Sequence, residues 1–369
     1  MIVTTLLFVV GLALLVMGAE LLVRGASKLA LALGISPLVI GLTIVAYGTS
    51  APEMAVSIGA GLTGQPSIAL GNAVGSNIFN VLFILGLSAL IAPLVVNQQL
   101  VRVDVPIMIG VSILLWILLL DNHLGKLDGI ILVAGSILYS ALAVILGRRE
   151  SQEIETEYAK AVGEPPKKTV STILLQLVLM AVGLGLLVLG SRWLVNGAVD
   201  FAKWLGVSDL VIGLTIIAAG TSLPEVATSV MATIRGQRDI AVGNVVGSNI
   251  FNILAILGVA SLVTPGGLTA QPALLAFDVP VMTAVALACL PILFTGHLIE
   301  RWEGGIFFGY YIAYTTYLVL RSMEHAALST FNYVMVAFIL PLTVITILVA
   351  VVRTMYGKPE LNVAGQDKL

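Results

Sequence analysis

Long apolar stretches alternate with short polar connectors along almost the whole chain. Many stretches reach the roughly 20 residues that a helix needs to cross a bilayer, so they predict membrane-spanning helices. Eleven spans are expected, at residues 2–32, 37–61, 67–92, 100–120, 125–147, 171–203, 209–234, 240–264, 274–295, 302–320 and 331–353. One connector, residues 148–170, is clearly polar and is interpreted as a flexible linker between two halves.

Two polar motifs within the spans occur twice, 172 residues apart. Gly-Thr-Ser-Ala-Pro-Glu at 48–53 returns as Gly-Thr-Ser-Leu-Pro-Glu at 220–225. Gly-Asn-Ala-Val-Gly-Ser-Asn-Ile-Phe-Asn at 71–80 returns with one change at 243–252. Five spans precede the linker and five matching spans follow it. Because five is an odd number, the second copy must cross the membrane in the opposite direction.

The predicted fold is therefore an all-α polytopic membrane protein with two inverted five-helix repeats and broken helices at the midplane. An eleventh, C-terminal transmembrane helix has no counterpart. The expected division is a first repeat at 1–147, a cytoplasmic linker at 148–170, a second repeat at 171–322, and the extra helix with a cytoplasmic tail at 323–369.

Each Pro-Glu motif predicts a broken helix near the middle of the membrane. Pro52 lacks an N–H and its ring crowds the carbonyl four residues earlier, so the break should free carbonyl oxygens around residues 46–48 and, by symmetry, 218–220. Broken backbone at this depth is tolerated only inside protein or along a wet cavity. The alternative interpretation is a capping box, in which Ser50 and Glu53 merely cap the half-helix.

The repeated polar side chains line one face of each helix. Positions four residues apart share a face, which aligns Thr49 with Glu53 and Ser76 with Asn80. A carboxylate at the centre of a span costs about 2.5–3.5 kcal/mol on insertion scales, so its presence twice indicates a cation site between the repeats. Ca²⁺ takes about 6–8 oxygen ligands. The two copies together offer an all-oxygen set: Glu53, Glu225, Thr49, Thr221, Ser76, Ser248, Asn80 and Asn252.

The composition argues against several other classes of protein. Of the 369 residues, 59% are hydrophobic and 10% are charged, and the net charge of −2 gives no indication of a nucleic-acid partner. The single Cys289 excludes a disulfide framework and is expected to pack in the core. The spans contain no nucleophile–base pair, so neither an enzyme nor a cofactor is expected. Asp104 and Asp278, each in Asp-Val-Pro, are interpreted as helix N-caps.

The distribution of Lys and Arg predicts the orientation. Basic residues concentrate on the cytoplasmic side of a membrane protein. With the N-terminus outside, 14 of the 18 basic residues lie on the cytoplasmic side and four lie outside, namely Lys126, Arg192, Lys203 and Arg321. We therefore expect a multi-pass protein of the cell (inner) membrane with its N-terminus outside and its C-terminus in the cytoplasm.

The paired motifs resemble those of prokaryotic sodium/calcium exchangers of the calcium:cation antiporter superfamily, over roughly residues 1–320. The resemblance implies a secondary active antiporter that exchanges Ca²⁺ for Na⁺ by alternating access. It implies that Ca²⁺ is bound by Glu53 and Glu225 with the backbone carbonyls of Thr49 and Thr221. For Na⁺ it adds Ala46, Ser50, Ser76, Ala218, Ser222 and Ser248, with Asn80 and Asn252 at the centre.

Exchange of Ca²⁺ for H⁺, or of another divalent cation, is the alternative. The proton-coupled branch of the superfamily carries a Glu soon after its Gly-Asn pair, whereas this chain has Gly-Ser at 75–76 and 247–248, which favours Na⁺. The K⁺-dependent branch carries Asp at the position of Asn252, so no K⁺ requirement is expected. A passive channel is disfavoured by the duplicated broken helices around a closed acidic site. The expected partners are Ca²⁺, Na⁺ and the lipid bilayer, and the sequence does not indicate an oligomeric state.

Overall fold

The chain is almost entirely helical in the computed structural model, which describes residues 2–149, 169–207, 209–212, 215–216, 218–294 and 297–356. In the first repeat, η1, η2 and η3 are π-helical turns and η4 is a 3₁₀ turn. The helical elements of this repeat are α1 (Ile2–Leu33), α2 (Pro37–Ile40), η1 (Gly41–Val45), α3 (Ala46–Thr49), α4 (Ala51–Leu62), α5 (Pro66–Phe79), η2 (Asn80–Leu85), α6 (Gly86–Ile91), η3 (Leu100–Asp104), α7 (Val105–Leu118), η4 (Leu119–Asp121) and α8 (Lys126–Arg149).

The described helices of the second repeat follow the same order, and one further helix comes after them. The elements of the second repeat are α10 (Val170–Trp204), α11 (Asp209–Ile212), α12 (Ala218–Gly220), α13 (Leu223–Ile234), α14 (Arg238–Phe251), η6 (Asn252–Leu257), α15 (Gly258–Val263), η7 (Leu274–Asp278), α16 (Val279–Phe294) and α17 (Arg301–Ser322). We call the further helix the eleventh helix; it consists of α18 (Ala327–Val334), η8 (Met335–Ile339) and α19 (Leu340–Tyr356).

The helices occupy the positions of the predicted spans. Among the described residues, seven helices are long and apolar enough to cross a membrane, and the pair Pro37–Thr49 and Ala51–Leu62, bent by 45°, makes an eighth. Leu223–Ile234 and Leu274–Leu290 are shorter apolar helices, and α17 carries charged residues near its ends. Most of the predicted linker lies outside the described residues, so the division at 148–170 stays a prediction.

Two short antiparallel β-pairs join the repeats and reveal their symmetry. β1 (Leu94–Val95) pairs with β4 (Leu298–Ile299), and β2 (His123–Leu124) pairs with β3 (Leu268–Thr269). Each pair thus combines one strand of the first repeat with one strand of the second. Exchanging the repeats converts one pair into the other, which is the relationship expected for an inverted repeat with a pseudo-two-fold axis in the membrane plane.

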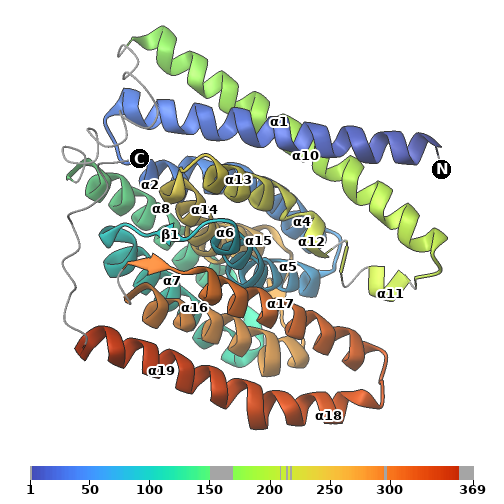
Figure 1. Ribbon diagram of the computed structural model, residues 1–369. Helices are drawn as coiled ribbons and strands as arrows, with labels where there is room; N and C mark the ends of the chain where they lie inside the picture. The colour runs from blue at the N-terminus through green and yellow to red at the C-terminus, as the bar shows by residue number, and fades with distance from the viewer. Residues whose placement is uncertain are drawn as a thin grey trace, which may run out of the picture.

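Helices α1 and α10 lie side by side along one edge of the bundle, opposite the eleventh helix (Figure 1). They run antiparallel and contact each other through glycines. A Cβ atom on Gly18 would lie 2.7 Å from the carbonyl oxygen of Gly183, and a Cβ atom on Gly183 would lie 2.8 Å from that of Gly18. Gly11 and Gly190 form a second reciprocal contact. Small residues allow close approach of membrane helices, so α1 and α10 form one tightly packed unit.

The interpretation of Asp104 and Asp278 as N-caps is wrong. Asp104 has helical dihedral angles (φ −73°, ψ −42°) and makes no side-chain capping bond. The Tyr139 hydroxyl donates to Asp104 Oδ1 at 3.1 Å, and the Tyr314 hydroxyl donates to Asp278 Oδ1 at 2.8 Å. Because the π-helical turns η3 and η7 run directly into α7 and α16, neither aspartate stands at a helix start.

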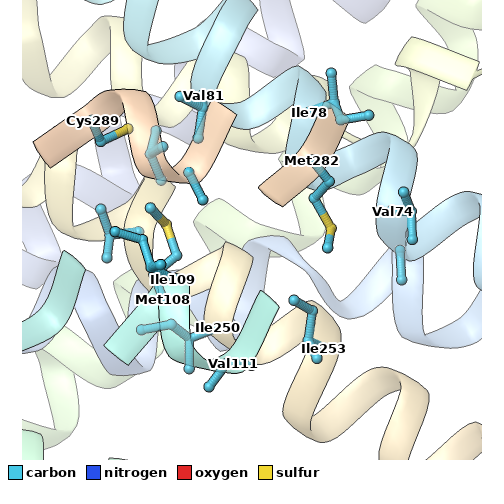
Figure 2. Close-up of a cluster of buried hydrophobic side chains, with 14 of the residues drawn as sticks. Val74, Ile78, Val81, Met108, Ile109, Val111, Ile250, Ile253, Met282 and Cys289 are labelled. Atoms are coloured by element: carbon cyan, nitrogen blue, oxygen red, sulfur yellow. The ribbon is translucent and has the colours of Figure 1, made fainter. Parts of the chain in front are cut away.

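The hydrophobic core extends across the boundary between the repeats. Val74 and Met108 of the first repeat lie in one cluster with Ile250 and Met282 of the second (Figure 2). Cys289 belongs to the same cluster, is 2% exposed and is a free thiol, which confirms that it packs in the core. The two repeats therefore share one core instead of packing as separate units.

We expect Gly183→Ala to destabilise the protein, because the new Cβ would lie 2.8 Å from the backbone of α1 at Gly18 and at Leu22. Overpacking of this kind costs about 1–3 kcal/mol. Gly185→Ala is the matched control on the same helix, since no heavy atom of the described residues lies within 4 Å of its Cβ position. The measurement is thermal unfolding in one detergent. Equal stability of the two variants would contradict the close contact.

Candidate cation site

The first broken helix ends at Thr49 and resumes at Ala51, with a bend of 45° between the halves. Pro52 lies in the first turn of the second half, where a missing N–H has no cost. The second repeat breaks in the same way, since Ser222 (φ −88°, ψ 8°) matches Ser50 (φ −82°, ψ 8°). The predicted break is confirmed in both copies.

One expectation about the break and one alternative interpretation of it are wrong. The Ala46 carbonyl is not freed, because it accepts the Ser50 N–H at 3.0 Å and the Thr49 hydroxyl at 3.4 Å. The physical reason is that α3 completes its last turn before the proline interrupts the helix. The capping box is also absent, since Ser50 makes no side-chain capping bond. Its hydroxyl group instead donates a hydrogen bond to the opposite repeat.

Each of the two carboxylates is buried and is held by a serine of the other repeat. Glu53 and Glu225 are each 1% exposed. The Ser222 hydroxyl donates to Glu53 Oε1 at 2.8 Å, and the Ser50 hydroxyl donates to Glu225 Oε1 at 2.8 Å. Neither repeat can form this arrangement alone, so the site belongs to the interface between them.

One further serine contacts each of the two serines that donate to the glutamates. Ser248 Oγ lies 3.0 Å from Ser50 Oγ, and Ser76 Oγ lies 3.2 Å from Ser222 Oγ. Both are buried, at 0% and 5% exposure respectively. Each glutamate is therefore connected to two hydroxyl groups in series, one from each repeat. These hydroxyl groups add neutral oxygens to the site.

Four asparagines form a hydrogen-bond network across the symmetry axis. Asn80 Nδ2 donates to Asn249 Oδ1 at 2.9 Å, and Asn252 Nδ2 donates to Asn77 Oδ1 at 2.9 Å. Asn77 Nδ2 also donates to the main-chain carbonyl of Asn249 at 3.1 Å, and Asn249 Nδ2 donates to that of Asn77 at 3.4 Å. The network fixes the amide groups of Asn80 and Asn252 with their nitrogens engaged and their oxygens available.

Four symmetric acceptors in this region have no hydrogen-bond partner among the described residues: Glu53 Oε2, Glu225 Oε2, Asn80 Oδ1 and Asn252 Oδ1. An unsatisfied buried polar group costs about 1–3 kcal/mol, and a charged one costs more. All four atoms are acceptors, which is the character of atoms that bind cations. Carboxylate and amide oxygens suit hard cations such as Ca²⁺.

Most of the residues predicted for the site lie in this region. Thr49 is fully buried and its Oγ1 lies 3.1 Å from Asn244 Oδ1, whereas Thr221 Oγ1 has no partner among the described residues. Ala46 is fully buried at the end of the first half-helix. For Ala218 the structure describes the helical backbone alone.

Asn77 and Asn249 were not predicted as part of the site. Each stands three residues before the central asparagine of its motif and is 2% exposed. Their duplication was the available indication, because both motifs contain Gly-Ser-Asn-Ile-Phe-Asn. The π-helical turns η2 and η6 begin directly at Asn80 and Asn252, and such turns are frequent at functional sites.

The comparison with known proteins agrees with this geometry. A family model described as sodium/calcium exchanger protein matches residues 3–145 and 175–320. This chain belongs to the sodium/calcium exchanger family. It is 33% identical to the sodium/calcium exchanger MaX1 of Methanosarcina acetivorans, over 86% of this chain and 98% of the relative.

Two further comparisons extend this result. The exchanger is 39% identical to the inner membrane protein YrbG of Escherichia coli, over 78% of this chain and 87% of the relative. The solved structure of the sodium-calcium exchanger NCX_Mj aligns with a TM-score of 0.72 at 33% identity, covering 84% of this chain and 97% of that one. The present protein is thus a multi-pass membrane antiporter for Ca²⁺ and another cation, and it is not an enzyme.

We expect Asn77→Ala to weaken Ca²⁺ binding, because the amide of Asn252 would lose the acceptor that orients it. Loss of a side chain that positions a ligand typically lowers affinity about 10–100-fold. Asn249→Ala should have a matching effect by symmetry. The exposed Asn196 on α10 provides the control, Asn196→Ala. The measurement is equilibrium Ca²⁺ binding to the purified proteins, and unchanged affinity in both network variants would contradict the role of the network.

Proposed function

We propose that this exchanger moves Ca²⁺ against Na⁺ across the cell (inner) membrane, with both ions bound in turn between the inverted repeats. The observation that carries the proposal is the symmetric set of buried acceptors without partners at Glu53, Glu225, Asn80 and Asn252. Two ionised glutamates give the site a formal charge of −2, which one Ca²⁺ neutralises. A second, neutral group of hydroxyl and amide oxygens then offers sites for Na⁺.

The ligands proposed for Ca²⁺ are the two glutamates with the backbone carbonyls of Thr49 and Thr221. The main-chain hydrogen bonds at the first break support this. The Ser50 N–H donates to the Ala46 carbonyl and the Met54 N–H donates to the Ser50 carbonyl, and these two bonds lie on either side of the Thr49 carbonyl. The ligands proposed for Na⁺ include Ala46, Ser50, Ser76, Ala218, Ser222, Ser248, Asn80 and Asn252.

Na⁺ is favoured over H⁺ as the coupling ion by Ser76 and Ser248. These residues contact the serines that donate to the carboxylates and supply neutral oxygens, where the proton-coupled branch of the superfamily has an additional glutamate. The related NCX_Mj was soaked with Na⁺ in its solved structure, which also supports Na⁺. Exchange for H⁺ is the second candidate, because Glu53 and Glu225 can themselves carry protons.

The surroundings of the site support alternating access, since they differ between the repeats. A Cβ atom on Gly247 would lie 2.5 Å from the carbonyl oxygen of Leu42, so the first repeat packs closely against the second-repeat motif at this glycine. The equivalent Gly75 is half-buried, whereas Gly247 is buried. Asn244 is 0% exposed, whereas its equivalent Asn72 is half-buried. In the proposed orientation the more open side faces outward.

The test is Ca²⁺ uptake by proteoliposomes that contain the purified protein. We expect an outward Na⁺ gradient to drive uptake, and choline in place of Na⁺ to abolish it. Choline in place of K⁺ on both sides should have no effect, because Asn252 adds no third carboxylate to attract a second cation. Uptake driven by a pH gradient without Na⁺ would establish the second candidate instead.

The same assay compares variants at the proposed site with a control variant elsewhere in the protein. Glu53→Gln and Glu225→Gln each remove half of the formal charge while they preserve the shape, so each should abolish Ca²⁺ flux in a protein that still inserts and folds. Glu324→Gln, at an exposed position outside the spans, is the control and should transport normally. Substantial flux in either site variant would refute the proposed ligands.

The orientation is proposed from the charge distribution, with 14 of 18 basic residues on the cytoplasmic side. A cysteine introduced within residues 150–165 should react with a membrane-impermeant reagent only from the cytoplasm. Cys289 provides little background because it is buried. Reaction from the outside would show that the orientation is inverted.

A further inference from the structure

The eleventh helix lies beyond the part of the chain that the sodium/calcium exchanger family model covers, since that match ends at residue 320. The helix runs along the side of the bundle opposite α1 and α10 (Figure 1). None of residues 327–346 is buried. Phe331, Met335 and Thr343 are half-buried, so the helix contacts α16 and α17 only loosely.

A cavity of about 430 Å³ lies between parts of the eleventh helix, α16 and α17. Its walls are almost entirely apolar. The Tyr310 hydroxyl donates to Thr343 Oγ1 at 2.8 Å, which joins α17 to α19 across the cavity and satisfies both polar groups. Apolar cavities do not hold ordered water. Residues that line the cavity include Val285, Ala288, Phe307, Ala313, Met335 and Val344.

The length of the cavity matches that of a single hydrocarbon chain. Along α17 the cavity extends from Ile306 to Tyr317, which is about 16 Å at the helical rise of 1.5 Å per residue. This length is close to half of the roughly 30 Å hydrocarbon core of a bilayer.

A basic residue lies one turn beyond the end of the cavity. The Arg321 guanidinium donates to the Tyr317 hydroxyl at 3.4 Å and lies 5.9 Å from the centre of its ring. Arg321 is exposed and has five N–H donors, so it can also bind a phosphate. It is four residues, or about 6 Å, from Tyr317 along the helix axis. A phosphate at Arg321 would therefore place the attached hydrocarbon chain at the mouth of the cavity.

We propose that the eleventh helix and the bundle together form a binding site for a membrane phospholipid, with one acyl chain in the cavity and the phosphate at Arg321. The chain fills the space that the loose packing leaves and adds contacts between this helix, α16 and α17. The site is separate from the cation site and does not depend on the identity of the transported ions.

The test uses the full-length protein in phosphatidylcholine vesicles that contain phosphatidylglycerol with a diazirine in its acyl chain. After irradiation, we expect mass spectrometry to find labels on the cavity walls, at Ala288, Ala313 and Met335, several-fold above the label on Ala337. Ala337 is exposed on η8 and does not line the cavity, so it reports on ordinary contact with bulk lipid.

Two kinds of variant connect the labels to the proposed site. The double variant Ala288→Leu, Ala313→Leu should fill the cavity and lower the wall labelling several-fold, whereas Ala337→Leu should leave it unchanged. Arg321→Gln should also lower wall labelling, by weakening the hold on the phosphate. Wall labelling no higher than at Ala337 in the unaltered protein would overturn the proposal. So would labelling that the cavity-filling and Arg321 variants leave intact, or a cross-linked dimer through this face in place of lipid adducts.

Discussion

The burial of two carboxylates at membrane depth is the constraint on which the rest of the structure depends. Glu53 and Glu225 are each 1% exposed, and removing such an ion from water costs several kcal/mol even after relaxation. Each glutamate receives its hydrogen bond from a serine of the opposite repeat. The stabilisation of one repeat's charge is therefore supplied by the other, and the two halves must dock before either carboxylate is compensated.

Docking also explains why the amide groups at the centre are ordered. Asn77 and Asn249 each accept from the central asparagine of the opposite repeat and donate to each other's main-chain carbonyl. The amide nitrogens of Asn80 and Asn252 are engaged in these bonds. Their amide oxygens remain available to the proposed ion. Because these acceptors are already ordered, the cation proposed to bind here would require little rearrangement.

The sequence was sufficient for the fold and the break, because duplicated motifs and proline chemistry act locally. It was insufficient for contacts that depend on docking. Ser50 matches a capping pattern, yet its hydroxyl serves Glu225, which lies 175 residues away in the chain. Asn77 was missed because the i, i+4 rule selects one helix face, whereas a central helix is surrounded by protein. Asp104 was misassigned because Asp-Val-Pro is compatible both with a cap and with a π-helical turn that continues into the helix.

The symmetry of the ion site is not matched by the contacts that surround it. Glu20 on α1 accepts two hydrogen bonds from Arg235 at the end of α13, at 2.9 and 2.6 Å. The equivalent positions, 172 residues away, are Arg192 and Thr63, which cannot form an ion pair. Exposed ion pairs contribute up to about 1 kcal/mol, which corresponds to a factor of about 5 in population. If the repeats exchange roles during transport, this pair favours the state in which α1 covers α13, so the identical ligand sets of the two repeats do not make the two states equal in energy.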